Sequence, residues 1–331
     1  MLTTFFIEGK EHERFVYPYI EILIKNKLPI KVYSFDYLVI NGVDSSNIEQ
    51  IAKKDFLRFC LNLESDYFIT TTPGIGNSYF PKSKIRKKSK RPLNIYVFHS
   101  LVSPNEVYSK NSFNGFDYIL APNSIIADQL KYITSKKNNI FTVGYPVISN
   151  NHYISYVGSK SNKILIAPSW GPNSIFQDQR FTDELIKNID IELKITLRPH
   201  PMEIELLKRF SKYKNIGFDY NKELKNLGEY QFLITDWSGI GIEYSAITSN
   251  KAIYILNEKK KRRSLKNKEK NLKLIEYEIR KTCGVLIEKG NLNELNQLTK
   301  RRKDFYIQDT NYLDKITTPK FDEHKFLKIF E

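Results

Sequence analysis

The sequence predicts an α/β protein built from two domains, each with a parallel sheet. Short apolar runs alternate with longer amphipathic segments, as in proteins whose strands are buried on both faces and joined by helices. The chain has 331 residues, and at roughly 100–200 residues per domain this length suggests two hydrophobic cores. The pattern lapses between Val147 and Lys163, in a polar stretch that we take as the domain boundary.

Local patterns predict the elements in order. In the first half, strands are expected at residues 30–33, 67–70, 95–98, 118–121 and 140–143, and helices at 14–25, 47–63 and 124–133. In the second half, strands are expected at residues 164–167, 194–197, 232–235 and 253–256, and helices at 183–187 and 203–213. Asn123 stands before one helix and is a favourable N-cap. We expect domains at residues 1–150 and 151–310, and a helix at 311–331 that packs back on the first domain.

The composition excludes several classes of protein. Hydrophobic residues make up 41% of the chain, which is too much for a disordered polymer. Cys60 and Cys283 stand alone, which excludes a disulfide scaffold and a structural zinc site and favours reduced thiols in a cytoplasm. No run approaches the roughly 18 apolar residues of a membrane span. A signal peptide is not expected either, because the charged residues Glu8 and Lys10 interrupt the apolar start of the sequence before a signal-peptide core could form.

The charge predicts an anionic partner. The chain carries 52 Lys and Arg against 37 Asp and Glu, a net charge of +15. Two basic runs extend from Lys82 to Arg91 and from Lys259 to Lys270. Near an anionic leaflet each such cation contributes about 1 kcal/mol, so the runs could hold the protein at the inner face of the plasma membrane. The alternative interpretation is that both runs are solvated loops without a binding partner. Nucleic acid is disfavoured because the runs lack interleaved aromatic residues and no nucleic-acid-binding motif is present.

Polar residues gather directly after four of the predicted strands. Ligands of α/β proteins bind beyond the carboxyl ends of parallel strands, so these residues are the candidates for chemistry. They are His99, Ser169, Arg198, His200 and Asp236.

Of these candidates, the segment after Thr235 has the clearest physical basis for binding a ligand. Asp236, Ser238 and Gly239 connect a strand to a helix, and a helix start offers unpaired N–H groups and the positive end of a dipole to an anion. Glu243 lies two turns further along and could reach a hydroxyl of the same ligand. A capping Asp or Ser beside a packed Trp is the structural alternative.

Two histidines are candidates for proton transfer or phosphate binding. His99 and His200 lie in different halves of the chain, and they would reach one cleft if the two domains face each other. A neutral imidazole can accept a proton from an attacking hydroxyl, and a charged one can hold a phosphate oxygen. A packed histidine without a chemical role is the alternative for each. His12, His152 and His324 lie in polar surroundings and are assigned no role.

Several motifs follow one another in a distinctive order over about residues 95–290. They are His99 after a strand, then FDYILAPN, VGYP, APSW, RPHP and TDWSGIGIEY. This order resembles the CDP-glycerol glycerophosphotransferase family, the polymerases and primases of teichoic-acid-like polymers. The resemblance implies a GT-B-like fold, in which two Rossmann-like domains with parallel sheets face a central cleft. It places an acceptor-side domain first and a nucleotide-donor domain second.

The resemblance also implies roles for individual residues. The two catalytic candidates are His99, as the base, and His200, which would hold the donor's phosphates. The donor-binding positions are Arg198, Ser169, Thr235, Asp236, Ser238, Gly239 and Glu243. The chain departs from the family's usual residues at Ser100, Gly171, Trp237 and Gly239. No DxD-type carboxylate pair is present, so we expect no metal site and no cofactor.

The implied activity is transfer of glycerol phosphate, or a related polyol phosphate, from a CDP-activated donor to a hydroxyl of a surface-glycan or teichoic-acid-like acceptor, with release of CMP. The departures raise the standing of a second hypothesis, a GT-B glycosyltransferase that uses a nucleotide sugar, for example a CMP-linked one, in capsule or lipopolysaccharide synthesis. A non-catalytic polyanion-binding protein on the same scaffold is the third. The expected partners are a CDP-polyol or nucleotide-sugar donor and an anionic or lipid-linked glycan acceptor.

Overall fold

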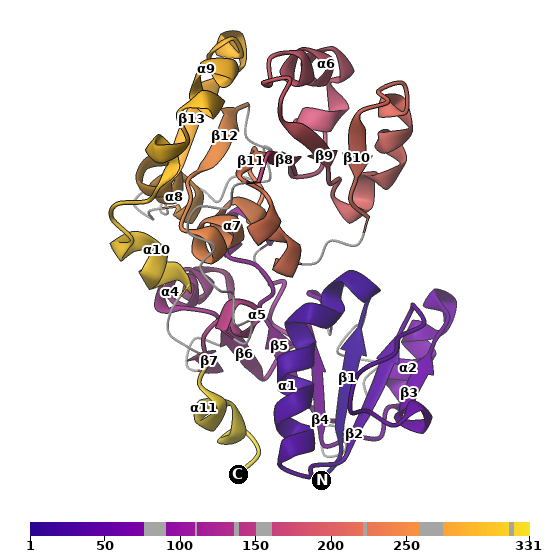
Figure 1. Ribbon diagram of the computed structural model, residues 1–331. Helices are drawn as coiled ribbons and strands as arrows, with labels where there is room; N and C mark the ends of the chain where they lie inside the picture. The colour runs from indigo at the N-terminus through magenta and orange to yellow at the C-terminus, as the bar shows by residue number, and fades with distance from the viewer. Residues whose placement is uncertain are drawn as a thin grey trace. The chain divides into compact units, whose positions relative to one another are not determined.

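Two parallel sheets organise the chain, one in each of two structural units (Figure 1). The first unit comprises Met1–Asn150 and Ile316–Glu331, and the second comprises Asn151–Lys315. The computed structural model describes residues 1–75, 91–109, 111–135, 139–149, 161–220, 224–257, 274–317 and 321–331. Both basic runs, apart from Arg91, and also His152 lie outside these described residues.

The described residues of the first unit form a seven-stranded sheet in the order β3-β2-β1-β4-β5-β6-β7. The strands are β1 (Thr3–Ile7), β2 (Ile30–Ser34), β3 (Ile48–Gln50), β4 (Tyr67–Thr70), β5 (Leu93–Val97), β6 (Tyr118–Ala121) and β7 (Ile140–Thr142). All neighbours pair in parallel, with Phe5 of β1 opposite both Val32 and Ile69. These apolar side chains are buried because helices cover parallel sheets on both faces.

The helices of the first unit are α1 (Glu13–Lys25), α2 (Phe56–Asn62), α3 (Pro104–Val107), α4 (Ser124–Ile133), α5 (Pro146–Ser149) and α11 (Glu323–Leu327). In α1, Val16, Ile20 and Leu23 repeat at helical spacing and belong to the buried cluster that includes residues of the sheet. Figure 1 shows α1 beside β1. The predicted cap of α4 is confirmed, since the Asn123 side chain accepts a hydrogen bond from the N–H of Ile126 at 2.8 Å.

The second unit contains a six-stranded sheet in the order β10-β9-β8-β11-β12-β13 over its described residues. The strands are β8 (Lys163–Ile166), β9 (Lys194–Leu197), β10 (Ile216–Phe218), β11 (Phe232–Thr235), β12 (Ala252–Leu256) and β13 (Gly284–Glu288). The helices are α6 (Gln179–Lys187), α7 (Ile240–Thr248), α8 (Ile275–Cys283), α9 (Glu294–Lys300) and α10 (Asn311–Thr317), with a 3₁₀ segment η8 (Pro201–Phe210).

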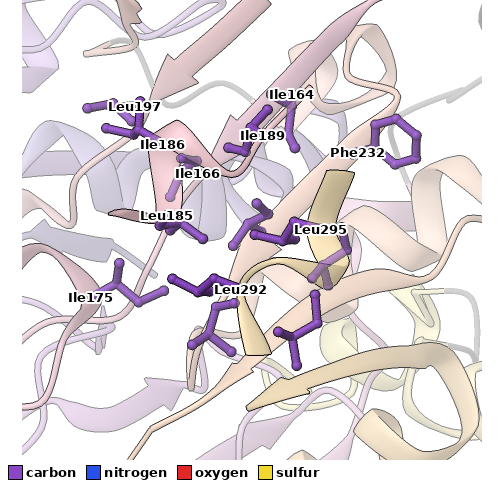
Figure 2. Packing of buried hydrophobic residues seen from close by; sticks show 14 of the residues in the cluster. Ile164, Ile166, Ile175, Leu185, Ile186, Ile189, Leu197, Phe232, Leu292 and Leu295 are labelled. Carbon is purple, nitrogen blue, oxygen red and sulfur yellow. The ribbon is translucent and has the colours of Figure 1, made fainter. Parts of the chain in front are cut away.

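The core of the second unit joins the sheet to its helices. Figure 2 shows Ile164 and Ile166 of β8 packed among side chains of the surrounding elements. Leu185 of α6 and Leu295 of α9 belong to the same cluster and are fully buried. This packing fixes the direction of the central strands and hence the position of the loops at their carboxyl ends.

Some expected elements were wrong. The helix expected at 47–63 is divided into β3 and α2, because β3 is an edge strand whose exposed or half-buried side chains carry a weak strand pattern. The helix expected at 203–213 is the 3₁₀ segment η8, with a kink at Glu203. The strands β1 and β13, of five residues each, and the three-residue strand β10 were not predicted; each pairs with a strand that is distant along the chain.

The end of the chain belongs to the core of the first unit. Phe326 of α11 is fully buried, and its ring centroid lies 4.9 Å from that of Tyr19 on α1. Ile329 joins the same cluster, so the last residues cover a face of the first sheet. In the part of the chain that the structure describes, no helix has the length and apolar character needed to cross a membrane.

This packing gives a first prediction. Phe326→Ala should lower the free energy of unfolding by about 3–5 kcal/mol, because it removes a fully buried ring and leaves a cavity beside Tyr19. Urea unfolding followed by circular dichroism measures this loss. Val39→Ala, at a side chain that is 75% exposed, is the control and should change the stability by no more than about 0.5 kcal/mol. Equal stability of the two variants would contradict the docking of α11.

Candidate functional site

In the first unit, His99 lies just beyond the carboxyl end of β5 among aromatic rings. Its ring centroid is 5.6 Å from that of Phe15, and its Nδ1 lies 3.3 Å from the hydroxyl of Tyr96. Tyr96 is fully buried and donates to the Tyr108 hydroxyl at 3.4 Å. The strand end therefore holds a half-buried imidazole in largely apolar surroundings.

A second imidazole lies beside it. The 3₁₀ segment η1 (Lys10–His12) follows β1 and brings the ring of His12 to 5.0 Å from that of His99, centroid to centroid. The Nδ1 of His12 is 2.7 Å from the Oγ1 of Thr71, which follows β4. The adjacent strands β1, β4 and β5 thus bring three polar groups together at one edge of the sheet. The sequence assigned no role to His12, because only the strand order reveals its neighbour.

Both imidazoles favour their neutral forms. Burial, together with the charges of His12 and Arg14, lowers the pKa of His99 to about 3. Burial also lowers the pKa of His12, although Glu11 and Glu8 act in the opposite direction. Near pH 7 both rings are therefore unprotonated, and His99 is in the form that can accept a proton.

In the second unit, the buried carboxylate of Asp236 joins three loops at the carboxyl ends of strands. Its Oδ1 accepts from the N–H groups of Ser169 and Trp237, both at 2.6 Å. Its Oδ2 accepts from the N–H of Ile175 and the Nδ2 of Asn257, both at 3.3 Å. A fully buried carboxylate requires such donors, so these contacts fix the loops after β8, β11 and β12. Direct contact between Asp236 and a donor substrate stays a prediction.

The start of α7 retains N–H groups for a ligand. Those of Ser238 and Gly239 have no acceptor among the residues that the structure describes, and both residues are half-buried. Gly241, in the first turn, lies so close to Tyr254 that a Cβ there would be 2.5 Å from its hydroxyl oxygen. The N–H groups and the helix dipole together are suited to an anion such as a phosphate.

His200 precedes η8 beside the ring of Trp170. Its Nδ1 accepts a hydrogen bond from the N–H of Met202 at 3.3 Å, and the two ring centroids are 5.7 Å apart. Because Nδ1 is an acceptor, the neutral ring carries its proton on Nε2. A contact between this N–H and a donor phosphate stays a prediction.

The other candidate donor-binding residues lie at or after the ends of β8, β9 and β11, or on α7. Arg198 is only 4% exposed and donates through Nε and Nη2 to Asp219, at 3.0 and 2.6 Å. Thr235 is buried and donates to a backbone carbonyl after β8, at 2.7 Å. Glu243 is buried on α7, whereas Ser169 is half-buried. Contacts of these residues with a donor stay predictions.

Two charged residues that sequence reasoning missed support this edge. Glu203 accepts from the N–H of Gly171 at 2.7 Å. Gly171 has a φ of +100°, which explains a glycine at this departure from the resembled family. Arg280 of α8 donates to the Asp236 carbonyl, and its guanidinium lies 3.6 Å from the ring centroid of Trp237. Arg280 is 44 positions after Asp236, and its sequence context carries no motif.

No group of three or more His, Cys, Asp and Glu side chains that could hold a metal ion occurs within the described ranges. The groups that the second unit offers to an anion at its strand ends are backbone N–H groups and an imidazole. They suit phosphate recognition through hydrogen bonds.

Comparison with known proteins gave matches to solved structures alone, since neither the family models nor the curated proteins include one that matches the chain. The wall teichoic acid polymerase TagF is similar with a TM-score of 0.63 and 16% identity, over 99% of this chain and 87% of that chain. The lipopolysaccharide outer core galactosyltransferase WaaB is similar with a TM-score of 0.51 and 13% identity, over 100% and 98%. HepE from Anabaena, in complex with UDP and glucose, has a TM-score of 0.51 and 12% identity, over 100% and 98%.

These similarities show the fold. Together with the two parallel sheets they establish a GT-B-like α/β architecture, which confirms the predicted fold class. At identities of 16% or less they assign neither a family nor a substrate to this chain.

The contacts of Asp236 give a second prediction. Asp236→Asn should lower the free energy of unfolding of the second unit by about 1–3 kcal/mol or more, because the amide replaces one acceptor oxygen with a donor that faces the existing N–H groups. Urea unfolding measures the loss. Asp304→Asn, at an exposed carboxylate in the same unit, is the control. If both variants match the wild type, Asp236 does not hold the loops together.

Proposed function

We propose that the protein is a transferase that moves glycerol phosphate, or a related polyol phosphate, from a CDP-activated donor to a hydroxyl of a surface-glycan or teichoic-acid-like acceptor. The main support is that a fold similar to that of TagF coincides with the ordered motifs, which lie at strand ends. One of the similar TagF structures was soaked with CDPG. The N–H groups at the start of α7 offer hydrogen bonds to the phosphates of such a donor.

The proposed reaction follows from the chemistry of these groups. The acceptor oxygen attacks the phosphorus nearer the polyol and gives its proton to His99. The bond from that phosphorus to the bridging oxygen breaks, and CMP leaves with the electron pair. His200 and the N–H groups of Ser238 and Gly239 bind the negative charge of the phosphates. Such a transfer depends chiefly on positioning and charge stabilisation, which fixed hydrogen-bond donors can supply.

A glycosyltransferase that uses a nucleotide sugar is the second candidate. The similarity to WaaB and to HepE with UDP and glucose favours it. The same N–H groups and imidazole would bind the diphosphate of a nucleotide sugar. The two candidates differ in the donor that is consumed, so a screen of donors separates them.

The donor screen is the third prediction. The wild type should release CMP from CDP-glycerol or CDP-ribitol when an acceptor glycan is present, and His99→Ala should lower kcat by about 10²- to 10⁴-fold because it lacks the base. His324→Ala, at an exposed histidine of the same unit, is the matched control. Turnover of nucleotide sugars alone would replace the first candidate with the second. A fully active His99→Ala enzyme would remove His99 from the mechanism.

The fourth prediction concerns nucleotide binding. Gly239→Pro removes one N–H group at the start of α7, and its φ of −64° suits proline. The loss of a hydrogen bond to a charged phosphate should raise the Kd for CDP by about 10- to 100-fold. His200→Ala should weaken binding similarly. Gly239→Ala keeps the N–H and is the control in the same calorimetric titration. Unchanged affinity in both Gly239→Pro and His200→Ala would refute this placement of the phosphates.

A further inference from the structure

His12 is held firmly, although no motif contains it. Its Nδ1 lies 2.7 Å from the Oγ1 of Thr71, and Thr71 is fully buried. The adjacent residue, Thr72, donates to the carboxylate of Glu8 at 2.9 Å. These contacts connect the end of β4 with the segment after β1. The ring of His12 is therefore fixed from one side.

The other side of His12 faces His99. Their ring centroids are 5.0 Å apart, and the ring of Phe15 packs against both, at 6.3 Å from His12 and 5.6 Å from His99. The guanidinium of Arg14 lies 4.6 Å from the centroid of Phe15. The two imidazoles thus share one partly apolar enclosure with a cation close by, where a second positive charge is costly.

We propose that His12 is a positioning residue for His99, and that the two imidazoles form a coupled pair in which a positive charge on one ring opposes protonation of the other. This inference rests on the proposed function, in which His99 is the base. When the acceptor's O–H bond breaks and an N–H bond forms on His99, the new charge lies beside a neutral ring. Thr71 keeps that ring in place through its hydroxyl.

The charged and titratable groups around the pair determine the order of protonation. Burial lowers the pKa of His12, Glu11 and Glu8 oppose that shift, and Arg14 lowers the pKa of both imidazoles. Tyr96 contacts the Nδ1 of His99 and stays a neutral phenol, because burial raises its pKa well above the usual value. His12 accordingly accepts the first proton as the pH falls. Its charge then lowers the pKa of His99.

The fifth prediction tests the pair by NMR on the full chain with ¹⁵N-labelled histidine. His12→Asn keeps an amide group near Thr71 but removes the imidazole. The pKa of His99 should then rise by about one pH unit, because a neighbouring positive charge is lost. This change in pKa is read from the pH, between 6 and 4, at which the NMR signals of the His99 ring begin to move. In His324→Asn, the control, the onset should not move.

The wild type supplies a second measurement that needs no variant to fold. In a coupled pair, the ring signals of His99 change when His12 takes its proton, at the pKa of His12. The signals of His324, which is exposed on α11, should not change at that step. If the His99 signals stay constant through the His12 titration, or if His99 titrates identically in His12→Asn, the pair does not exist.

The NMR readings need no substrate, so they distinguish two kinds of failure. Coupled histidines in a protein that releases no CMP would retain the pair and reject the proposed reaction. CMP release by a protein with uncoupled histidines would retain the reaction and reject the role of His12. If both hold, His12→Asn should also move the acid limb of the pH–rate profile to higher pH, whereas a purely structural defect would lower the rate at every pH.

Discussion

The buried carboxylate of Asp236 holds the loops at the carboxyl ends of β8, β11 and β12. A carboxylate that is removed from water must be hydrogen-bonded, and here four N–H donors from the three loops after β8, β11 and β12 meet that requirement. Arg280 adds a bond to the backbone carbonyl of the same residue and packs on Trp237. The positions of Ser169 and of the N–H groups that begin α7 depend on this cluster.

The first unit stabilises its candidate residues by other means. Aromatic packing surrounds His99, and a threonine hydroxyl holds His12. No acidic side chain is hydrogen-bonded to either imidazole in the described residues, so burial and the nearby charges of Glu11, Glu8 and Arg14 determine their charge. This environment favours a neutral base. The environment in the second unit instead presents positive ends of dipoles, which favour an anionic ligand.

In the reaction that we propose, these two environments have separate tasks. An attacking hydroxyl must lose a proton, and the phosphates must be held while negative charge moves toward the leaving group. Backbone N–H groups suit the second task, because they are fixed by the fold and need little reorganisation during the reaction. A GT-B-like glycosyltransferase has the same needs, which explains why the donor distinguishes the two proposals.

The sequence by itself determined the α/β class, the bounds of β4, β6, β9, β11 and α4, and the strand-end positions of His99 and His200, because periodicity, turns and caps are local signals. It missed β1 and β13, whose pairing partners are distant along the chain. Only the tertiary structure placed His12 beside His99 and Glu203 beside Gly171. Such contacts depend on which strands are neighbours in the sheet, and a parallel sheet pairs strands that are far apart in sequence.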